Sequence, residues 1–310
     1  MSIFSYATDA VARITRLTWF MIALAAAVYV VVMAIMLVAV RRNRRSDAAA
    51  VDLSDPGNRW VVLGGLIMPA IVLGTVLVFG LAAMGRERHP RPAVTISVAG
   101  HQWWWEVRYE FPDLPDRFVT ANEIHIPVGA PVRLVLTTKD VIHSFWVPQL
   151  QGKIDLIPGD TNELSLVAKR AGTYRGICAE FCGMEHAKMG IVVVAEDSST
   201  FRQWARDQLA EAQPPADSLA LAGKQLFESG PCSMCHAVRG TPAAASVAPD
   251  LTHVGSRTTI AAGVLPNTLG NLEGWIADAQ SIKPGALMPR ITTFSGHELR
   301  AVAAYVAGLK

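Results

Sequence analysis

The sequence predicts a multidomain protein: a two-helix transmembrane hairpin, then an all-β domain, then an all-α domain. Two long uncharged apolar stretches predict the hairpin, and short β-type segments separated by turn residues predict the β domain. Short helical patterns between Gly/Pro/Thr loops predict the last domain. The 310 residues carry a net charge of +2 and are 51% hydrophobic, which argues against a nucleic-acid-binding protein and against a disordered chain.

The first stretch, Trp19–Val40, has 22 residues and the second, Trp60–Met84, has 25. A bilayer core needs about 20 apolar residues per helix, so both can span it. The first is too long for a signal peptide, and arginines follow it instead of a small-residue cleavage site. We expect residues 1–90 to form the hairpin, with helices at about 17–40 and 60–84. Pro69 lies inside the second helix, which membrane helices tolerate.

Arginine distribution predicts the orientation of the hairpin. The connection between the two stretches has five arginines, against two before the first stretch and three just after the second. The positive-inside rule then places the connection in the cytoplasm. We therefore expect a multi-pass protein of the cell (inner) membrane, with both termini and all later domains on its outer, periplasmic face.

The expected β domain covers residues 91–197, and its clearest strands are 95–99, 123–126, 132–136 and 190–194. A helix and linker follow at 198–216. Ser198 or Ser199 is expected to cap this helix, which places Phe201, Trp204, Ala205 and Leu209 on one face. Pro214 and Pro215 end it. The α domain is expected at 217–310.

Soft metal ligands cluster in the segment CAEFCGMEHAKM, which starts at Cys178. Thiolate, imidazole and thioether groups together select copper, whereas structural zinc sites do not use a thioether. Two thiolates four residues apart can bridge a pair of metal ions, each completed by one imidazole and one weak ligand. Such a site suits electron transfer better than catalysis. A disulfide is the alternative for the two cysteines. The candidate ligands are His143, Cys178, Cys182, His186 and Met189.

Four segments resemble subunit II of the haem–copper (cytochrome c) oxidases: VIHSFWVP, CAEFCGMEHAKM, GHQWWWE at 100–106 and QGKIDLIPGD at 151–160. The resemblance covers about residues 15–197 and implies a cupredoxin-like fold for the β domain. It also implies a binuclear copper centre of the CuA kind. Cys178 and Cys182 would bridge both coppers, and His143 and His186 would bind one each. Met189 would be the weak ligand of one copper and the Glu180 carbonyl that of the other.

The same resemblance gives roles to two further residues. The Glu180 side chain would contribute to a magnesium site shared with the catalytic subunit. Trp103 would be the residue at which electrons reach the copper, its alternative being an aromatic core or membrane-interface position. One departure concerns residues 55–60, where many family members carry a glutamate near a proton path. Asp55 is the candidate substitute here.

The segment Cys232-Ser-Met-Cys235-His236 is a CxxCH, the attachment sequence of c-type haem. Cys232 and Cys235 would bind the haem covalently, and His236 would bind its iron. A zinc half-site is disfavoured because no second CxxC and no paired histidines follow. A weak sulfur ligand suits electron transfer, which favours Met288 as the second axial ligand over His253.

The segment from about Leu219 resembles class I cytochrome c in three pieces: AGKQLF, APDLTHVGSR and KPGALMP. By this resemblance the carbonyl of Pro249 orients His236. The whole chain then resembles the electron-input subunit of a caa-type terminal oxidase, which carries a fused cytochrome c domain. Electrons would pass from haem c to the binuclear copper and on to a separate catalytic subunit that reduces oxygen to water.

The implied partners are catalytic subunit I, subunit III, the membrane and an electron donor such as a cytochrome c or a quinol–cytochrome c reductase. The enzyme activity would belong to the complex. Two alternatives stay open: the equivalent subunit of a copper-containing nitric oxide reductase, and a free membrane-anchored electron carrier or copper-delivery protein. The quinol-oxidase branch is disfavoured because it lacks these copper ligands. Residues 91–197 have a net charge of −3 and residues 217–310 of +1, which fits contact between the two domains.

Overall fold

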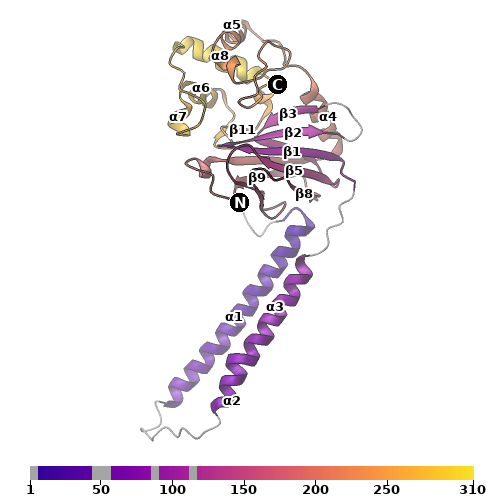
Figure 1. Ribbon diagram of the computed structural model, residues 1–310, viewed down its shortest axis with the longest axis vertical. Helices are drawn as coiled ribbons and strands as arrows, with labels where there is room; N and C mark the ends of the chain where they lie inside the picture. Colours follow the sequence, from indigo (N-terminus) through magenta and orange to yellow (C-terminus); the bar gives the residue numbers. More distant parts are fainter. Residues whose placement is uncertain (1–5, 44–56, 85–90, 112–116) are drawn as a thin grey trace. The chain divides into compact units, whose positions relative to one another are not determined.

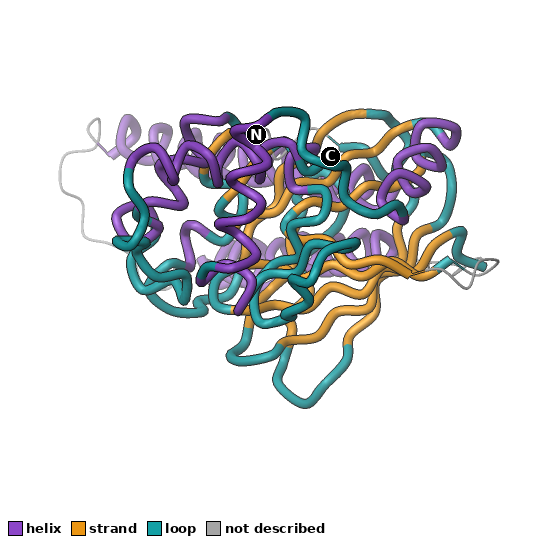
Figure 2. The backbone as a smooth tube through the Cα atoms, turned by 90° about the horizontal axis from the view of Figure 1, so that it is seen from above, coloured by secondary structure: helices purple, strands orange, loops and turns teal. Residues whose placement is uncertain are grey.

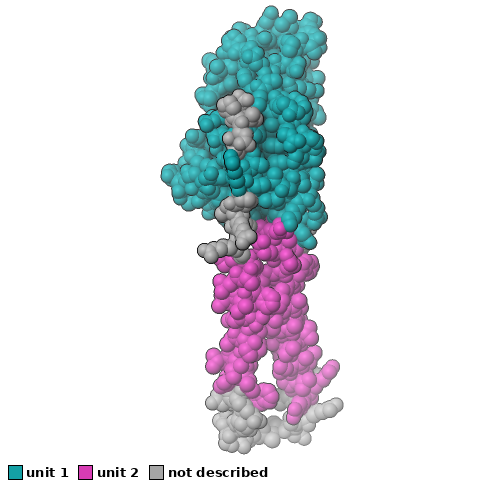
Figure 3. All heavy atoms as spheres, turned by 90° about the vertical axis from the view of Figure 1, so that its right-hand side faces the viewer, with its two compact units in different colours: residues 1–8, 89–310 teal, residues 9–88 magenta. Residues whose placement is uncertain are grey.

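A pair of long helices and a part built of strands and shorter helices make up the chain (Figure 1). The computed structural model describes residues 6–43, 57–84, 91–111 and 117–310. One compact unit holds residues 9–88 (magenta in Figure 3) and the other residues 1–8 and 89–310 (teal). Asp55, the candidate substitute for the glutamate, lies outside the described residues.

The helical unit is an antiparallel hairpin. Helix α1 covers Asp9–Asn43 and so begins before the uncharged stretch, with Asp9 in its first turn, where the helix dipole favours a negative charge. The rings of Phe20 and Phe79 stack with centroids 4.6 Å apart. Nε of Arg13 donates to the carbonyl of Ala83 at 3.4 Å. The amino-terminal end of α1 therefore lies against the carboxyl end of the second helix.

The second helix has three segments: α2 (Gly57–Val62), the π-helix η1 (Leu63–Ile67) and α3 (Met68–Met84). The N–H of Met68 donates to the carbonyl of Leu63, five residues earlier. Pro69 follows at once and has no N–H, and its ring would crowd the carbonyl four residues back in a regular helix. The widened π turn accommodates this proline.

Both helices are long and apolar enough to cross a membrane, over Asp9–Arg42 and Trp60–Met84. No residue of α3 is buried, and the helix is apolar all round. Such a helix needs an apolar surrounding, which lipid supplies.

Two five-stranded sheets form the β domain, seen as the orange strands of Figure 2. The first has the order β3-β2-β1-β5-β8 and the second the order β4-β10-β9-β6-β7. Pairs β1/β5 and β4/β10 are parallel, and the other neighbours are antiparallel. All four segments expected as strands are confirmed. The strand bounds are β1 Val94–His101, β2 Trp104–Glu110, β3 Arg117–Ala121, β4 Glu123–Pro127, β5 Val132–Thr138, β6 His143–Trp146, β7 Ile154–Leu156, β8 Asn162–Leu166, β9 Gly172–Cys178 and β10 Gly190–Glu196.

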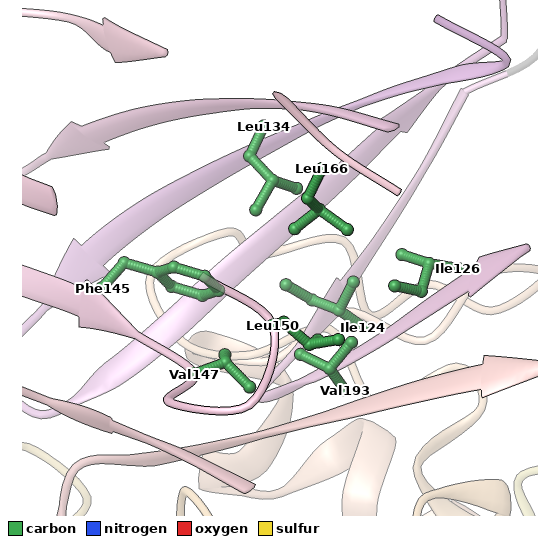
Figure 4. Close-up of a pocket in the computed structure, with 8 residues that line it drawn as sticks. All are labelled: Ile124, Ile126, Leu134, Phe145, Val147, Leu150, Leu166 and Val193. Atoms are coloured by element: carbon green, nitrogen blue, oxygen red, sulfur yellow. The ribbon is translucent and has the colours of Figure 1, made fainter. Parts of the chain in front are cut away.

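Apolar side chains of both sheets point toward one another in the core of this sandwich (Figure 4). They alternate with outward-facing residues, as along β9, where every second residue is buried. Figure 4 labels eight residues of this core: Ile124, Ile126, Leu134, Phe145, Leu166 and Val193 on strands, and Val147 and Leu150 in the turn after β6. The packed sheets give the loops between their strands a rigid base.

Helix α4 (Ser198–Leu209) follows the sandwich, and its cap differs from the expectation. Asp197, not Ser198 or Ser199, is the cap: its carboxylate accepts hydrogen bonds from the N–H groups of Ser199 and Thr200. Strand β10 ends at Glu196, so the chain turns into the helix one residue earlier than expected. Phe201 and Ala205 are buried against the sandwich, as expected for one apolar face.

The carboxyl-terminal part is helical, with a second apolar core. Gly223 of α5 lies so close to α8 that a Cβ atom there would be 1.9 Å from the carbonyl oxygen of Ala301. Only a glycine permits this approach. Besides the expected helices, this part has two short strands of two residues each, which pair with one another. The elements are α5 Ser218–Ser229, η3 Pro231–Met234, η4 Val254–Ser256, β11 Thr259–Ile260, β12 Leu265–Pro266, α6 Leu269–Ala277, α7 Ala279–Ile282 and α8 Gly296–Gly308.

Candidate metal centres

The five expected copper ligands converge at one end of the sandwich. Strands β6 and β9 pair with Phe145 opposite Cys178, which brings His143 beside the loop that follows β9. Sγ of Cys178 lies 3.8 Å from Nδ1 of His143 and 3.7 Å from Sγ of Cys182. Sγ of Cys182 lies 3.6 Å from Nδ1 of His186 and 3.8 Å from Sδ of Met189.

The loop from Cys178 to Met189 is closed by the strands at its ends. The N–H of Cys178 donates to the carbonyl of Met189 at 2.9 Å, so both ends of the loop lie side by side. Within it, the carbonyl oxygen of Glu180 lies 3.2 Å from Sγ of Cys178. All six expected donors, five side chains and one carbonyl, thus face one small volume.

The two thiols are not a disulfide. Their 3.7 Å separation is far longer than the S–S bond of about 2.05 Å. Hydrogen bonds with Cys182 and with His143 lower the pKa of Cys178 well below its ordinary value. The same hydrogen bond with Cys178 keeps the proton on Cys182 and therefore raises the pKa of Cys182. One thiolate therefore forms readily, and thiolate is the form that binds metal.

Asp140 fixes the orientation of His143, and the sequence analysis did not identify it. Nε2 of His143 bonds to Oδ1 of Asp140 at 2.7 Å, which leaves Nδ1 for the thiols. Burial opposes ionisation of this carboxylate, but hydrogen bonds from His143 and the Gln102 N–H lower the pKa of Asp140. A carboxylate on the second nitrogen is typical of metal-binding histidines. An acidic residue three positions before a candidate ligand was the available signal.

Gly100 supports the same ring from the other side. A Cβ atom at Gly100 would lie 2.7 Å from Cδ2 of His143, closer than real side chains approach. The imidazole thus occupies the space beside strand β1 that a side chain would fill. This explains the glycine at the start of the GHQWWWE segment.

The three consecutive tryptophans have different environments. Nε1 of Trp103 donates to the carbonyl of Cys182 at 3.0 Å, so Trp103 touches the copper-ligand loop directly. The Trp104 ring stacks on His101 with centroids 4.3 Å apart. Trp105 is fully buried in the sandwich core, beside Phe145. Of these three side chains, Trp103 is the one whose described hydrogen bond reaches the loop.

The carboxylate of Glu180, expected at a magnesium site, already has a cationic partner. Oε2 of Glu180 lies 3.2 Å from Nζ of Lys153, and both side chains are about half exposed. Lys153 belongs to the segment at 151–160 that carries the family resemblance. A divalent ion at this carboxylate would replace the Lys153 ammonium.

The CxxCH segment forms the 3-10 helix η3 and the turn after it. The His236 N–H donates to the carbonyl of Cys232 at 3.0 Å, which places both thiols and the imidazole on one tight turn. Nδ1 of His236 bonds to the carbonyl of Pro249 at 2.7 Å, as expected. Nε2 is therefore the nitrogen left for iron. Burial lowers the pKa of His236, which favours the neutral imidazole that binds metals.

Met288 and Cys232 pack against the same apolar cluster of the helical domain. Gln280 fixes the Met288 backbone, because its Nε2 donates to the carbonyls of Ala286 and Met288 at 2.6 and 2.7 Å. His253, the other axial candidate, is buried, and its Nε2 bonds to the carbonyl of Ala210 at 3.0 Å. His253 thus holds the linker, as a loop histidine would.

Comparison with known proteins identifies the families of both domains. Residues 116–196 match the family described as "Cytochrome C oxidase subunit II, periplasmic domain", and residues 220–310 match "Cytochrome c". The chain is 38% identical over 293 residues to a cytochrome c oxidase subunit 2 of Alkalihalophilus pseudofirmus, covering 92% of this chain and 84% of the relative. The chain belongs to the cytochrome c oxidase subunit II family.

A further relative is the cytochrome c oxidase subunit 2 of Bacillus subtilis, 32% identical over 266 residues that cover 81% of this chain and 73% of the relative. Among solved structures, the periplasmic domain of subunit II of cytochrome oxidase from Bradyrhizobium japonicum is 32% identical. The match covers 40% of this chain and 100% of the solved Bradyrhizobium chain, with a TM-score of 0.36. As a subunit II protein, the chain combines membrane-anchoring helices, a cupredoxin-like domain and a cytochrome c domain, and it is part of an oxidoreductase complex. Its two matched domains indicate copper and haem c as cofactors.

Proposed function

We propose that this subunit II is the electron-input subunit of a respiratory terminal oxidase. It takes electrons from a donor through haem c and a binuclear CuA centre to the catalytic subunit, which reduces oxygen to water. One observation carries the proposal: five soft side-chain donors from two strands and one loop converge with neighbouring donor atoms 3.6–3.8 Å apart. When bound, the copper and the haem supply one-electron redox chemistry.

In the copper centre, Cys178 and Cys182 would bridge the two ions, and His143 and His186 would bind one each. Met189 and the Glu180 carbonyl would be the weak ligands. The donor set fits copper because thiolates, imidazoles and a thioether are its preferred ligands. Cys178, Cys182 and Met189 are nearly fully buried and His143 completely so, which excludes water and keeps the ligands from rearranging.

In the haem site, Cys232 and Cys235 would hold the porphyrin covalently, and His236 and Met288 would bind the iron. Two features of this domain fit a haem. Pro249 leaves one nitrogen of His236 free to bind the iron. Nη2 of Arg257 donates to the carbonyl of Asp250 at 2.5 Å, whereas its buried Nε has no hydrogen-bond partner among the described groups and could donate to an anionic propionate.

Trp103 would receive electrons for the copper centre, because its indole bonds to the backbone of the ligand Cys182. The Glu180 carboxylate would bind magnesium at the interface with the catalytic subunit after releasing Lys153.

The membrane orientation and the domain limits belong to the same proposal. The arginine-rich connection would lie in the cytoplasm, with both termini and the metal domains on the outer face. The hairpin would occupy residues 1–90, the copper domain 91–197, the helix and linker 198–216 and the cytochrome c domain 217–310. Subunits I and III and an external cytochrome c or quinol–cytochrome c reductase would be the partners.

The test is metal content and a near-infrared spectrum of the detergent-purified chain, with and without dithionite. The proposal expects two coppers per haem iron and a near-infrared band that bleaches on reduction. One copper or none, with haem present, would leave a membrane-anchored cytochrome and refute the relay.

A further inference from the structure

The cytochrome c domain lies on the copper domain within one compact unit, and described hydrogen bonds join them at three places. The N–H and hydroxyl of Thr258 donate to the carboxylate of Glu123. The N–H of Gly190, next to the ligand Met189, donates to the carbonyl of Ala262 at 2.9 Å. The third place is the segment 279–288, which contacts the copper-ligand loop itself.

Lys283 is the centre of this third contact. Only 3% of Lys283 is exposed, and its ammonium donates to the carbonyl of Trp103 at 2.5 Å and to that of Ala261 at 3.4 Å. From the copper side, Nζ of Lys188 donates to the carbonyl of Ile282 at 2.8 Å. Two lysines thus cross the boundary in opposite directions, each to a backbone carbonyl of the other domain.

The next residues of the segment cover the Trp103 ring. A Cβ atom at Gly285 would lie 3.5 Å from Cη2 of Trp103 and 3.6 Å from Sδ of Met184, so the backbone of Gly285 packs on both side chains. The N–H of Gly285 donates to Oε1 of Gln280, whose Nε2 holds Met288. The backbone that covers Trp103 is therefore fixed to the backbone of the expected iron ligand.

We propose that Trp103 is the docking site of the chain's own segment 279–288, and that Lys283 is the positioning residue that holds the segment there. This rests on the proposed function and adds the identity of the copper centre's immediate partner. A separate donor protein would then bind the cytochrome c domain, because the face of Trp103 beside Gly285 is already covered.

The buried ammonium of Lys283 fixes the position of segment 279–288 on Trp103 more strictly than an apolar contact would. It must keep its carbonyl partners in place, because a buried charge without hydrogen bonds is costly. Hydrogen bonds from a charged donor are also stronger than those between neutral groups. Sliding of the segment across Trp103 would break the contact at Lys283.

The test is hydrogen–deuterium exchange of the full chain in detergent, followed by mass spectrometry. In the wild type we expect protection of peptides covering 279–288 and 182–190. Lys283→Met, of similar length but uncharged, should make both exchange at least about tenfold faster, because local opening sets the rate. Lys283→Arg should restore protection, which a loss of packing alone would not explain. Lys224→Met, the same change on α5 beside Glu228, is the matched control and should change neither peptide.

If Lys283→Met unfolds the cytochrome c domain, Lys188→Met still tests the docking. It removes the contact from the copper side and should speed exchange in the same two peptides, with α5 and α8 unchanged. Wild-type peptides without protection, or unchanged exchange in Lys188→Met, would overturn the docking.

Copper and iron contents are measured on the same samples, so the two proposals can fail separately. Two coppers per iron with an unprotected segment 279–288 would refute the docking alone. A wild-type chain without copper would refute the proposed function, whatever the exchange shows.

Discussion

The imidazole of His143 is held between Asp140 and Cys178: Nε2 lies 2.7 Å from Oδ1 of the first and Nδ1 lies 3.8 Å from Sγ of the second. The carboxylate accepts the N–H on the outer nitrogen, so the inner nitrogen presents its lone pair to the copper site. Asp140 is itself held by the N–H groups of Gln102 and Val141. The orientation of one candidate copper ligand thus depends on a carboxylate outside the proposed ligand set.

We expect Asp140→Ala to weaken copper binding by about 10–100-fold, the usual effect of removing the partner of a metal-binding histidine. Competition with a copper chelator measures the affinity. Asp140→Asn keeps an oxygen that accepts the His143 N–H and should lose much less. Equal affinity in the wild type and Asp140→Ala would show that the ring needs no support.

Cys178→Ser should abolish copper binding while haem c stays attached and reducible, because the two sites share no residue. The reciprocal variant, Cys232→Ser with Cys235→Ser, should lose covalent haem and keep copper. Metal analysis and haem staining of denatured protein measure both. Electron flow from haem to oxygen in Cys178→Ser would show that the proposed order of the relay is wrong.

A buried acid–base group on the copper domain predicts a pH dependence of stability. His125 bonds to Glu196 at 2.9 Å and to Glu123 at 3.3 Å, and its ring stacks on Trp204 with centroids 4.1 Å apart. Burial lowers the pKa of His125, but the hydrogen bonds to both glutamates outweigh it, so the pKa is raised. The protonated ring is therefore more stable in the folded protein than in the unfolded one.

The stabilisation from His125 should be complete below the unfolded pKa of about 6.5 and be lost as pH rises through the higher folded pKa. Thermal unfolding midpoints of the purified chain between pH 6 and 9 measure the loss. His125→Gln should flatten this slope, whereas His297→Gln, an exposed change at the start of α8, should not. A slope that His125→Gln leaves unchanged would assign the effect to other groups.

Gly223→Ala should destabilise the cytochrome c domain by about 1–3 kcal/mol, the usual effect of overpacking. The added methyl group would collide with the Ala301 carbonyl and push α5 away from α8. Gly274→Ala on α6, where a Cβ atom meets nothing within 4 Å, is the control and should add about 0.5–1 kcal/mol of stability. Chemical unfolding followed by haem absorbance distinguishes the two, and equal stability of both variants would contradict the close helix contact.

The convergence of the candidate copper ligands was largely predictable because four of them lie within twelve residues, so the spacing from Cys178 to Met189 already describes one loop. Two details were not. The sequence does not show that β2 begins at Trp104, which buries Trp105 in the core and leaves Trp103 beside Cys182. The cap of α4 moved to Asp197 because β10 ends one residue before it. Both depend on where a strand begins or ends, which local sequence preference determines poorly.

The contacts between domains were beyond sequence reasoning for another reason. Opposite net charges suggested that residues 91–197 and 217–310 meet, but not which residues do so. Lys283 and Glu123 are charged residues of the kind ordinarily found at the surface, yet both are buried and both bond to the other domain. Hydropathy patterns report burial within one element and carry no information on a surface that a distant segment covers.

The end of α4 and the linker that follows it bond to the cytochrome c domain. Arg239 donates to the carbonyls of Gln208 and Leu209, and the N–H of Ala212 donates to the carbonyl of Arg239. A donor joined to its acceptor by so short a tether meets it at an effective concentration of about millimolar or more. In the proposed relay, electron transfer between the two domains would then be a first-order process, independent of how much protein the membrane holds. Added salt, which screens charges over about 10 Å at 0.1 M, would slow only the delivery of electrons from outside the chain.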